Sequence, residues 1–503
     1  MRQPAALFHF RPISAPQAHP VHLVIARLAC LLPGSIKKPQ NFPYPASLRC
    51  VFPHFSSFAC SPDAVPMATV TPEKEPDLRC ELIKAVLAIS GAEKPAEPPS
   101  PHHGEEDRPR VRMRSKGSNT NKHDARGDAV DYCVLQLLRH KVPMWAATEL
   151  GYRFADAYGN ELHSHPTAFD QDKYESLNSS EWIAKANAYI QKFLHSLGTT
   201  DAILPVKPET WDDVKVSVYE NRNHKKDMED KKIILPKLSV VEPSLKHGLE
   251  NASLFAVFDG HGGLGVASYS ATHYPSCVVN RYKTGDSDFV ANGLRDLEKR
   301  IIARTVKEHV SGGSTAVVAV WRPDADQVDY AWIGDSSIGV MTEEEVITLT
   351  KPHNLKDPSE CARVTSEGGL IMNIYGEDRV NGVLNITRAL GDYNAKPMVS
   401  AEPGVGSFKP SETGYFLLFL ASDGVWDYTT PRVIYNTVVN YVHTHEVADY
   451  VGLSTAISVV ALKESPDNMM LLTVYLKSPE EVWKYFSGVA LQAPAGETPI
   501  TEL

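Results

Sequence analysis

The sequence predicts an α+β catalytic domain, in which two packed, mostly antiparallel β-sheets are flanked by helices, preceded by a small helical domain. After Trp211, short apolar runs of strand type are separated by Gly, Asp and Asn, without the regular strand–helix alternation of a parallel sheet. Before Trp211, apolar residues recur at helical spacing instead. With 503 residues, 43% of them hydrophobic, the chain can form one or two domains with tails.

Two amphipathic helices define the expected helical domain, residues 128–205. The first covers residues 128–142 and is ended by a proline. The second covers residues 181–197, with Ser179 or Ser180 as its N-cap. Apolar stripes of this kind normally pack in a core, and we expect core packing here. Binding of a partner protein to the outer faces is the alternative.

The expected catalytic domain, residues 211–478, is rich in buried-type strands. Strands are predicted over residues 214–220, 253–259, 314–321, 328–335, 415–423 and 468–476. A helix is expected over residues 357–369, because Asp357 is a good N-cap, Pro358 stands at the first helical position and two glycines end the run. Residues 479–503 are expected to form a C-terminal tail.

Residues 1–127 are expected to contribute no ordered domain. The first acidic residue is Asp63, and an acid-poor, arginine-bearing start is typical of a mitochondrial transit peptide, although the many prolines disfavour its helix. The alternative is that translation starts at Met67 and the earlier residues are a gene-model extension. Residues 95–127 have the composition of a disordered linker. Its basic run, residues 108–116, is either solvated or a nuclear-import or docking patch.

Composition excludes several classes of protein. The net charge of −10 disfavours nucleic acid and anionic membranes as partners. The seven cysteines are scattered without a CxxC pair, so neither a zinc site nor a disulfide framework is indicated. Free thiols are typical of a reducing compartment, and we therefore expect the cytoplasm or the nucleus. No apolar run reaches the length of about 18 residues that a membrane span needs.

Acidic residues stand at the ends of several predicted strands. They are Glu229, Asp230, Asp259, Asp335, Asp423 and Asp467. Strands of one sandwich would bring these carboxylates to a common rim, where mutual repulsion would raise their pKa values. A bound cation relieves that repulsion, and ligands that are all oxygen favour a hard ion such as Mg²⁺ or Mn²⁺. Several shared carboxylates indicate two ions, which suits the activation of water against a phosphoester.

A set of short motifs in fixed order resembles the metal-dependent type-2C protein phosphatases. The motifs are "DMED", "VFDGHGG", "GGSTAVVAV", "WIGDSS", "NGVLNITRALGD", "ASDGVWD" and "SPDN". Each motif alone is weak, but the ordered set is specific and spans residues 214–476, more than half of the chain. Within the family, the chain is most similar to the calmodulin-dependent-kinase phosphatase and to a nematode sex-determination phosphatase.

The resemblance implies metal-binding roles at the matching positions. Asp259 would bridge two Mn²⁺ or Mg²⁺ ions, and the carbonyl of Gly260 would reach one of them. The two shells would be completed by Glu229, Asp423 and Asp467, with support from Asp230. Asp335 and Asp427 match acids that hold a weaker third ion. The nucleophile implied is a water molecule activated by the metal pair.

The resemblance also assigns residues to the substrate. His261 matches the general acid that protonates the leaving oxygen, a role typically worth about 10²- to 10⁴-fold in rate. Lys225 stands where the family usually has an arginine that clamps the phosphate, and lysine lacks the planar pair of donors. Arg222 lies nearby and could substitute. Arg388 and Asp392 are expected to form a buried structural pair.

The sequence therefore predicts an enzyme that hydrolyses phosphoserine and phosphothreonine in proteins. The resemblance further implies a role in a sex-determination or signalling complex, with protein partners at the helical domain. The alternative is a non-catalytic scaffold or adaptor that retains the phosphatase fold. All the candidate metal acids are present, which favours the enzyme.

Overall fold

The structure is a computed structural model that describes residues 120–122, 124–162, 175–197, 204–207, 211–242, 245, 248–309 and 311–492. The predictions for the N-terminal region up to residue 119 lie outside the described residues. These are the transit peptide, the start at Met67 and most of the linker with its basic run. Residues 493–503 also lie outside them.

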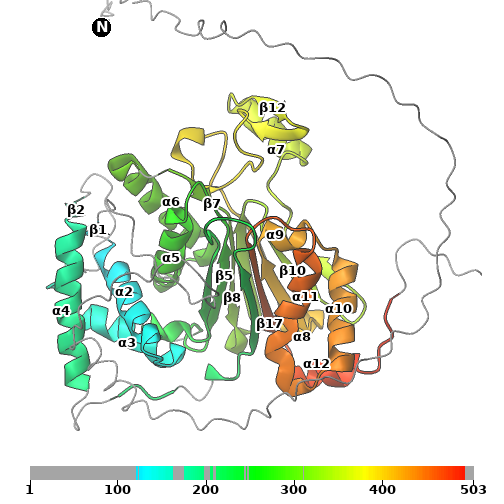
Figure 1. The fold of residues 1–503 in the computed structure, drawn as a ribbon, viewed down its shortest axis with the longest axis horizontal. Helices are drawn as coiled ribbons and strands as arrows, with labels where there is room; N and C mark the ends of the chain where they lie inside the picture. Colours follow the sequence, from blue (N-terminus) through cyan, green and yellow to red (C-terminus); the bar gives the residue numbers. More distant parts are fainter. Residues whose placement is uncertain are drawn as a thin grey trace, which may run out of the picture. The chain divides into compact units, whose positions relative to one another are not determined.

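Two five-stranded antiparallel sheets form the catalytic domain and confirm the predicted fold class (Figure 1). In spatial order, the first sheet contains β15 (Gly404–Phe408), β9 (Gln327–Ile333), β8 (Ala316–Arg322), β5 (Ser253–Phe258) and β4 (Lys231–Leu235). The second contains β11 (Val346–Thr348), β10 (Ser337–Met341), β16 (Leu417–Ala421), β17 (Met469–Tyr475) and β3 (Val216–Asn221).

The central strands are apolar throughout because both of their faces are buried. In β5, Phe255 and Val257 belong to the core between the two sheets. The alternate residues Leu254, Ala256 and Phe258 face the other way and pack under helices. Successive strand side chains point to opposite faces, so a strand between two cores has no polar face. Each fully buried Val, Leu or Phe side chain contributes about 1.5–3 kcal/mol.

Helices cover the outer face of each sheet (Figure 1). The first sheet packs against α5 (Gly265–Lys283) and α6 (Phe289–Glu308). The second packs against α10 (Pro431–Thr444) and α11 (Leu453–Leu462). The resulting order of layers is helix, sheet, sheet, helix.

A short helix occupies the start of the expected C-terminal tail, so that expectation is wrong for residues 479–486. This helix, α12 (Pro479–Phe486), is closed at its start by a capping box between Ser478 and Glu481. Its Val482 and Phe486 are fully buried in the core beside the second sheet. The apolar face of α12 makes it part of the domain.

The helical region precedes the first sheet and contains three helices, α2 (Ala125–Arg139), α3 (Met144–Ala157) and α4 (Ser179–Leu197). A pair of two-residue strands, β1 (Thr120–Asn121) and β2 (Ser176–Leu177), joins the segment before α2 to the segment before α4. The structure starts α2 before the predicted Asp128, and α3 was not predicted. The cap of α4 is also different, because Asn178 Oδ1 accepts from the backbone N–H groups of Ser180 at 3.1 Å and Glu181 at 3.3 Å.

The helical region shares one continuous core with α5 and α6. Buried charged groups join them at the start of α2. Asp128 Oδ1 lies 3.4 Å from His273 Nε2 of α5, and Asp124 Oδ1 lies 3.5 Å from Arg300 Nη1 of α6. Gly127 faces the imidazole of His273, and a Cβ at this position would lie 2.5 Å from its Nδ1. The glycine therefore allows α2 to approach α5 closely.

A hairpin and a helix project beside the sheets, namely α7 (Pro358–Ser366), β12 (Ile371–Ile374) and β13 (Glu377–Val380). The predicted N-cap is confirmed, because Asp357 Oδ1 accepts from the backbone N–H of Ser359 at 3.0 Å. Smaller elements are α8 (Pro410–Thr413) and α9 (Asp423–Trp426).

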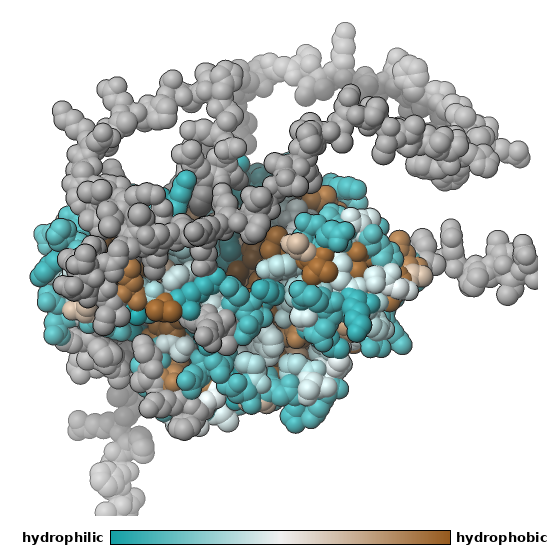
Figure 2. Space-filling view, turned by 90° about the horizontal axis from the view of Figure 1, so that it is seen from below, coloured by the Kyte–Doolittle hydropathy of each residue, from teal (hydrophilic) through white to brown (hydrophobic). Residues whose placement is uncertain are grey.

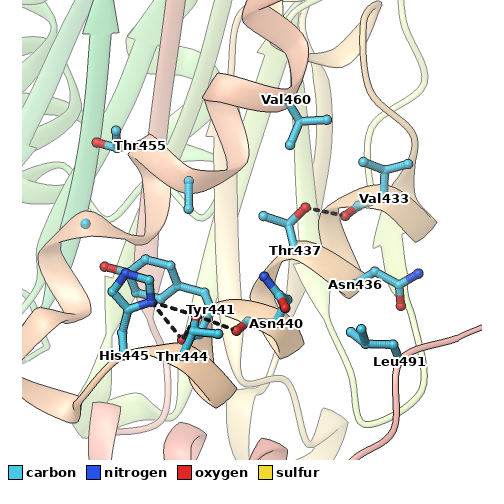
Figure 3. Close-up of a pocket in the computed structure, with 12 residues that line it drawn as sticks. Val433, Asn436, Thr437, Asn440, Tyr441, Thr444, His445, Thr455, Val460 and Leu491 are labelled. Carbon is cyan, nitrogen blue, oxygen red and sulfur yellow. Dashed lines mark hydrogen bonds between the residues drawn. The ribbon is translucent and has the colours of Figure 1, made fainter. Parts of the chain in front are cut away.

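A groove of about 760 Å³ lies between α10 and α11 (Figure 3). Its lining residues include Asn440, Thr444, Val460 and Leu491. None of the predicted site residues lines it. The face of the molecule in Figure 2 is mainly hydrophilic with separate apolar patches. Within the described ranges, no helix is long and apolar enough to cross a membrane.

Candidate active site

The predicted acids meet at one end of the two sheets. Asp259 follows β5 and Asp335 lies just beyond β9, while Asp423 begins α9 after β16. Asp230 precedes β4, and Asp467 stands just before β17. In an antiparallel pair the end of one strand lies beside the start of its neighbour, as Phe258 lies opposite Lys231. The topology therefore converts distant sequence positions into one cluster.

Asp230 is at the centre of this cluster. It is 1% exposed, and Ser422 Oγ donates a hydrogen bond of 2.9 Å to its Oδ2. Its pKa is raised to about 7, first by burial and then by the charges of Asp423 and Asp467. The pKa of Asp259 lies well above its usual range through burial and through the charges of Asp230 and Asp423. The family resemblance gave Asp230 only a supporting role.

Three further acids, Asp335, Asp423 and Asp427, continue the cluster. The pKa of Asp335 is raised to about 8 by burial and by the charges of Asp423 and Asp427. Asp423 has its pKa raised to about 6 by burial and by Asp467. Burial also raises the pKa of Asp427. The cluster is thus a row of carboxylates that disfavour one another's ionisation.

The cluster fits a divalent cation in its donor chemistry. All its side-chain donors are carboxylate oxygens, which suit Mg²⁺ or Mn²⁺. Asp230 Oδ1 is buried and has no hydrogen-bond partner among the described residues. In the part of the chain that the structure describes, no three His, Cys, Asp or Glu side chains already surround one point as a finished metal site. A cation would therefore have to draw the neighbouring carboxylates inward.

Glu229 is brought to the cluster by its backbone. Its N–H donates to Asn468 Oδ1 at 2.7 Å, and its carbonyl oxygen would lie 2.7 Å from a Cβ placed on Gly260. Its carboxylate is not among the charges that chiefly raise the pKa of Asp230 or Asp259. The structure therefore places the backbone of Glu229 next to Gly260, at the edge of the cluster.

Asn468 is a site residue that the sequence analysis missed. Its Nδ2 donates to the carbonyls of Arg222 at 2.8 Å and Asp227 at 3.1 Å, while its Oδ1 accepts from Glu229. One side chain thereby ties the loop before β4 to the strand end that carries Asp467. The motif "SPDN" contained this residue, but only its acid was assigned a role.

Lys225 reaches the cluster and Arg222 does not. Lys225 Nζ lies 2.8 Å from Asp467 Oδ1. Burial lowers the pKa of Lys225, but the hydrogen bond to Asp467 and the charges of Asp467, Asp423 and Asp259 outweigh it, so the net shift is upward. The exposed Arg222 instead donates from Nη1 to the carbonyl of Lys226 at 3.1 Å.

His261 lies in a three-stranded strip beside the acids. The strip consists of β14 (Leu390–Gly391), β7 (Gly313–Ser314) and β6 (Gly260–His261), in that order. His261 Nε2 lies 2.6 Å from Asp392 Oδ2. The general acid predicted from the sequence therefore stands at the cluster with a carboxylate behind it.

The expected pairing of Arg388 with Asp392 is wrong. Arg388 donates to both carboxylate oxygens of Glu360, including Nε to Oε2 at 3.2 Å. Burial raises the pKa of Glu360, but hydrogen bonds from Arg388, Thr387 and Arg363 outweigh this and lower it to about 2. The pair separates because Gly391 and Asp392 have left-handed backbone angles, with φ of +75° and +48°. Residues spaced four apart face one another only in a helix.

Comparison with known proteins agrees with this geometry. The family described as Protein phosphatase 2C matches residues 214–464. Protein phosphatase fem-2 of Caenorhabditis elegans is 34% identical over 369 residues, covering 71% of this chain and 78% of that protein. Human Protein phosphatase 1F is 31% identical over 275 residues, covering 53% of this chain and 58% of that protein. Mouse Protein phosphatase 1E is 25% identical over 362 residues, covering 71% of this chain and 47% of that protein.

A solved structure extends the likeness to the helical region. It is described as the structure of a C. elegans sex determining protein and is 30% identical in sequence, with a TM-score of 0.65. The match covers 73% of this chain and 91% of the solved one. The two sheets, the carboxylate cluster and these likenesses lead to one conclusion: the chain belongs to the protein phosphatase 2C family.

Proposed function

We propose that this chain is a Mn²⁺- or Mg²⁺-dependent phosphatase that hydrolyses phosphoserine and phosphothreonine in proteins. The observation that carries the proposal is the row of carboxylates around Asp230, whose pKa values are raised by burial and by one another. His261 and Lys225 stand beside it. Membership in a phosphatase family whose members depend on Mn²⁺ or Mg²⁺ supports the same reading.

The chain's own residues divide the work. The residues that would hold the two ions are Glu229, Asp230, Asp259, Asp423 and Asp467, together with the carbonyl of Gly260. Asp335 and Asp427 would hold a weaker third ion. When bound, divalent ions supply activation of the attacking water and neutralise charge on the phosphate. Lys225 adds positive charge for the phosphate at the edge of the cluster, and His261 delivers a proton to the leaving serine or threonine oxygen.

We further propose that the protein acts in the cytoplasm or the nucleus, within a complex that controls sex determination or signalling. The solved structure whose match extends over the helical region supports this role, since it is described as that of a sex determining protein. The outer faces of α2, α3 and α4 would then contact partner proteins. The test compares the partner proteins bound by the unaltered full chain with those bound by a variant in which charged surface residues of α4 are reversed. If both proteins bind the same partners, this assignment is contradicted.

The central test measures turnover of a phosphothreonine peptide by the full chain. Activity should require Mn²⁺ and disappear with a chelator. Asp259→Asn should reduce turnover by at least about 10²-fold, since it removes an ion ligand. Asp156→Asn is a matched control, because Asp156 lies in an exposed pair with Arg126 on the helical region. Absence of Mn²⁺-dependent turnover in the unaltered chain would leave the scaffold as the remaining function.

A further inference from the structure

We propose that Asp392 is a positioning residue for His261, and that Gly313 exists to leave room for their contact. The inference rests on the proposed phosphatase function, in which His261 is the general acid. It gives Asp392 a role other than the structural pair expected from the sequence, and it gives Gly313 a role for the first time. The three-stranded strip carries His261 and Gly313, and Asp392 follows it directly.

Gly313 is the middle position of that strip. It pairs with His261 on one side and with Gly391 on the other. Asp392 follows Gly391 directly, so the imidazole and the carboxylate approach each other across Gly313. The two side chains meet with His261 Nε2 2.6 Å from Asp392 Oδ2.

The missing side chain of Gly313 makes this meeting possible. A Cβ on Gly313 would lie 2.1 Å from Asp392 Oδ2 and 2.6 Å from His261 Nε2. Both distances are shorter than any tolerable contact, and both atoms are the ones that form the hydrogen bond. Even alanine would therefore push the imidazole and the carboxylate apart.

Asp392 is itself held in place from the helix side. Its backbone N–H donates to the carbonyl of Gly312 at 3.0 Å. Glu298 of α6 accepts from the N–H of Gly391 at 2.8 Å and lies 3.1 Å from Lys396 Nζ. These contacts anchor the backbone of the turn that carries Asp392 and so restrict the positions that its short side chain can reach.

The contact decides which nitrogen of His261 can serve the reaction. A carboxylate only accepts, so Nε2 carries the proton that it donates to Asp392. The ring is then fixed in orientation, and its other nitrogen, Nδ1, has no hydrogen-bond partner among the described residues. In the protonated ring Nδ1 carries the second proton, which passes to the leaving oxygen as its bond to phosphorus breaks.

The first test compares two substrates in the presence of Mn²⁺. A phosphothreonine peptide needs a proton on its leaving oxygen, whereas p-nitrophenyl phosphate releases a stable phenolate without one. Asp392→Asn should lower kcat for the peptide by about 10- to 100-fold, comparable to the cost of losing the partner that orients a metal-bound histidine. Its kcat for p-nitrophenyl phosphate should change by less than about threefold, because the leaving phenolate of this substrate needs no proton. Equal losses on both substrates, or no loss on the peptide, would overturn the proposal.

Two more variants sharpen this test. Gly313→Ala should reproduce the selective loss of kcat for the peptide, although the side chains of His261 and Asp392 are both still present. In a His261→Gln background, Asp392→Asn should have no further effect on peptide turnover, because it acts through His261. Additive losses would contradict a positioning role. Asp156→Asn again serves as the matched control.

The second test does not depend on activity. In the metal-free full chain, the ring nitrogen-15 shifts of His261 should change in Asp392→Asn, because the acceptor of the Nε2 proton is altered. They should stay unchanged in Asp156→Asn. Unchanged shifts in Asp392→Asn would show that the contact does not exist. This result is separate from the proposed function, which falls only if the unaltered chain fails to hydrolyse the peptide.

Discussion

Lys225 is the residue that we propose supplies charge to the substrate phosphate, at the position where the family resemblance leads us to expect an arginine. Its Nζ lies 2.8 Å from Asp467, so its charge is already at the cluster. An ammonium group acts as a point charge, whereas a guanidinium can bind two phosphate oxygens in parallel. The chemistry of hydrolysis is untouched by this difference, and phosphate affinity is the property that it should change.

Lys225→Arg should therefore tighten substrate binding. One added charge-assisted hydrogen bond is worth about 1 kcal/mol net, which corresponds to a KM for the phosphopeptide about three- to tenfold lower. The kcat should stay within about twofold, because the new contact exists before and during the reaction. Steady-state kinetics with Mn²⁺ measures both quantities. A higher KM would show that the site is shaped around lysine.

The carboxylate cluster should make metal-free stability depend on pH. Burial and mutual charge raise the pKa values of Asp230 to about 7, Asp335 to about 8 and Asp423 to about 6. An unfolded Asp titrates near about pH 3.9. Between that pH and about pH 8 the folded state binds more protons than the unfolded state, so stability falls as pH rises through this window.

Divalent ions should reverse this loss. Mn²⁺ neutralises the ionised carboxylates, so the rise in Tm that it causes should be several degrees larger at pH 8 than at pH 5. Differential scanning calorimetry with and without Mn²⁺ measures the difference. Asp259→Asn should show a smaller rise at both pH values. A Mn²⁺ effect that is the same at pH 5 and pH 8 would contradict the cluster as the origin.

At the level of single residues, the sequence predicted which side chains lie at the strand ends but not how they are connected. Strand-end acids such as Asp259 can be recognised because an apolar run stops at them. Asn468 and Asp392 act through contacts that depend on turns with left-handed backbone and on partners more than 100 residues away. No local spacing encodes such contacts.

Among the elements, α12 shows a signal that was present but unused. The stretch from Ser478 to Phe486 carries a capping box and apolar residues at helical spacing. In α3 the buried face mixes Leu150 and Phe154, spaced four apart, with small residues such as Ala147 and Gly151. The small residues weaken the apolar pattern, and this helix was not predicted from the sequence.

Phe486→Ala should destabilise the catalytic domain strongly. The ring is 0% exposed and lies 4.9 Å from that of Phe416, measured between centroids. Removing a buried Phe side chain costs about 3–5 kcal/mol, including the cavity that it leaves. The free energy of unfolding from urea titration measures this loss. Lys484→Ala, on the exposed face of α12, should change it by less than about 0.5 kcal/mol. Equal effects of the two substitutions would mean that α12 is not docked.

In the whole molecule, the strands were recognisable but their order was not. The second sheet places β3 beside β17 and β10 beside β16. These neighbours are set by pairing between distant segments, which an apolar pattern alone does not specify. The close docking of the helical region was unpredicted for the same reason.

Gly127→Ala should loosen the helical region from the catalytic domain. In an isolated helix, replacing glycine with alanine stabilises the helix by about 1 kcal/mol. Here the added methyl would lie 2.5 Å from Nδ1 of the buried His273 ring. We therefore expect a net destabilisation of about 1–3 kcal/mol and faster proteolysis between α4 and β3. Urea unfolding and limited proteolysis measure these effects. A stabilised protein would show that α2 does not rest against α5.

The pairing of β3 with β17 has a consequence for biosynthesis. The first and last strands of the catalytic domain are hydrogen-bonded neighbours, from Val216 opposite Val474 to Asn221 opposite Met469. On the ribosome, Asp230 and Asp259 emerge well before Asp423 and Asp467. A nascent chain that ends before Asp467 lacks this carboxylate and also β17, the strand that joins β16 to β3. The proposed divalent-ion site is therefore completed late in translation, when the domain closes.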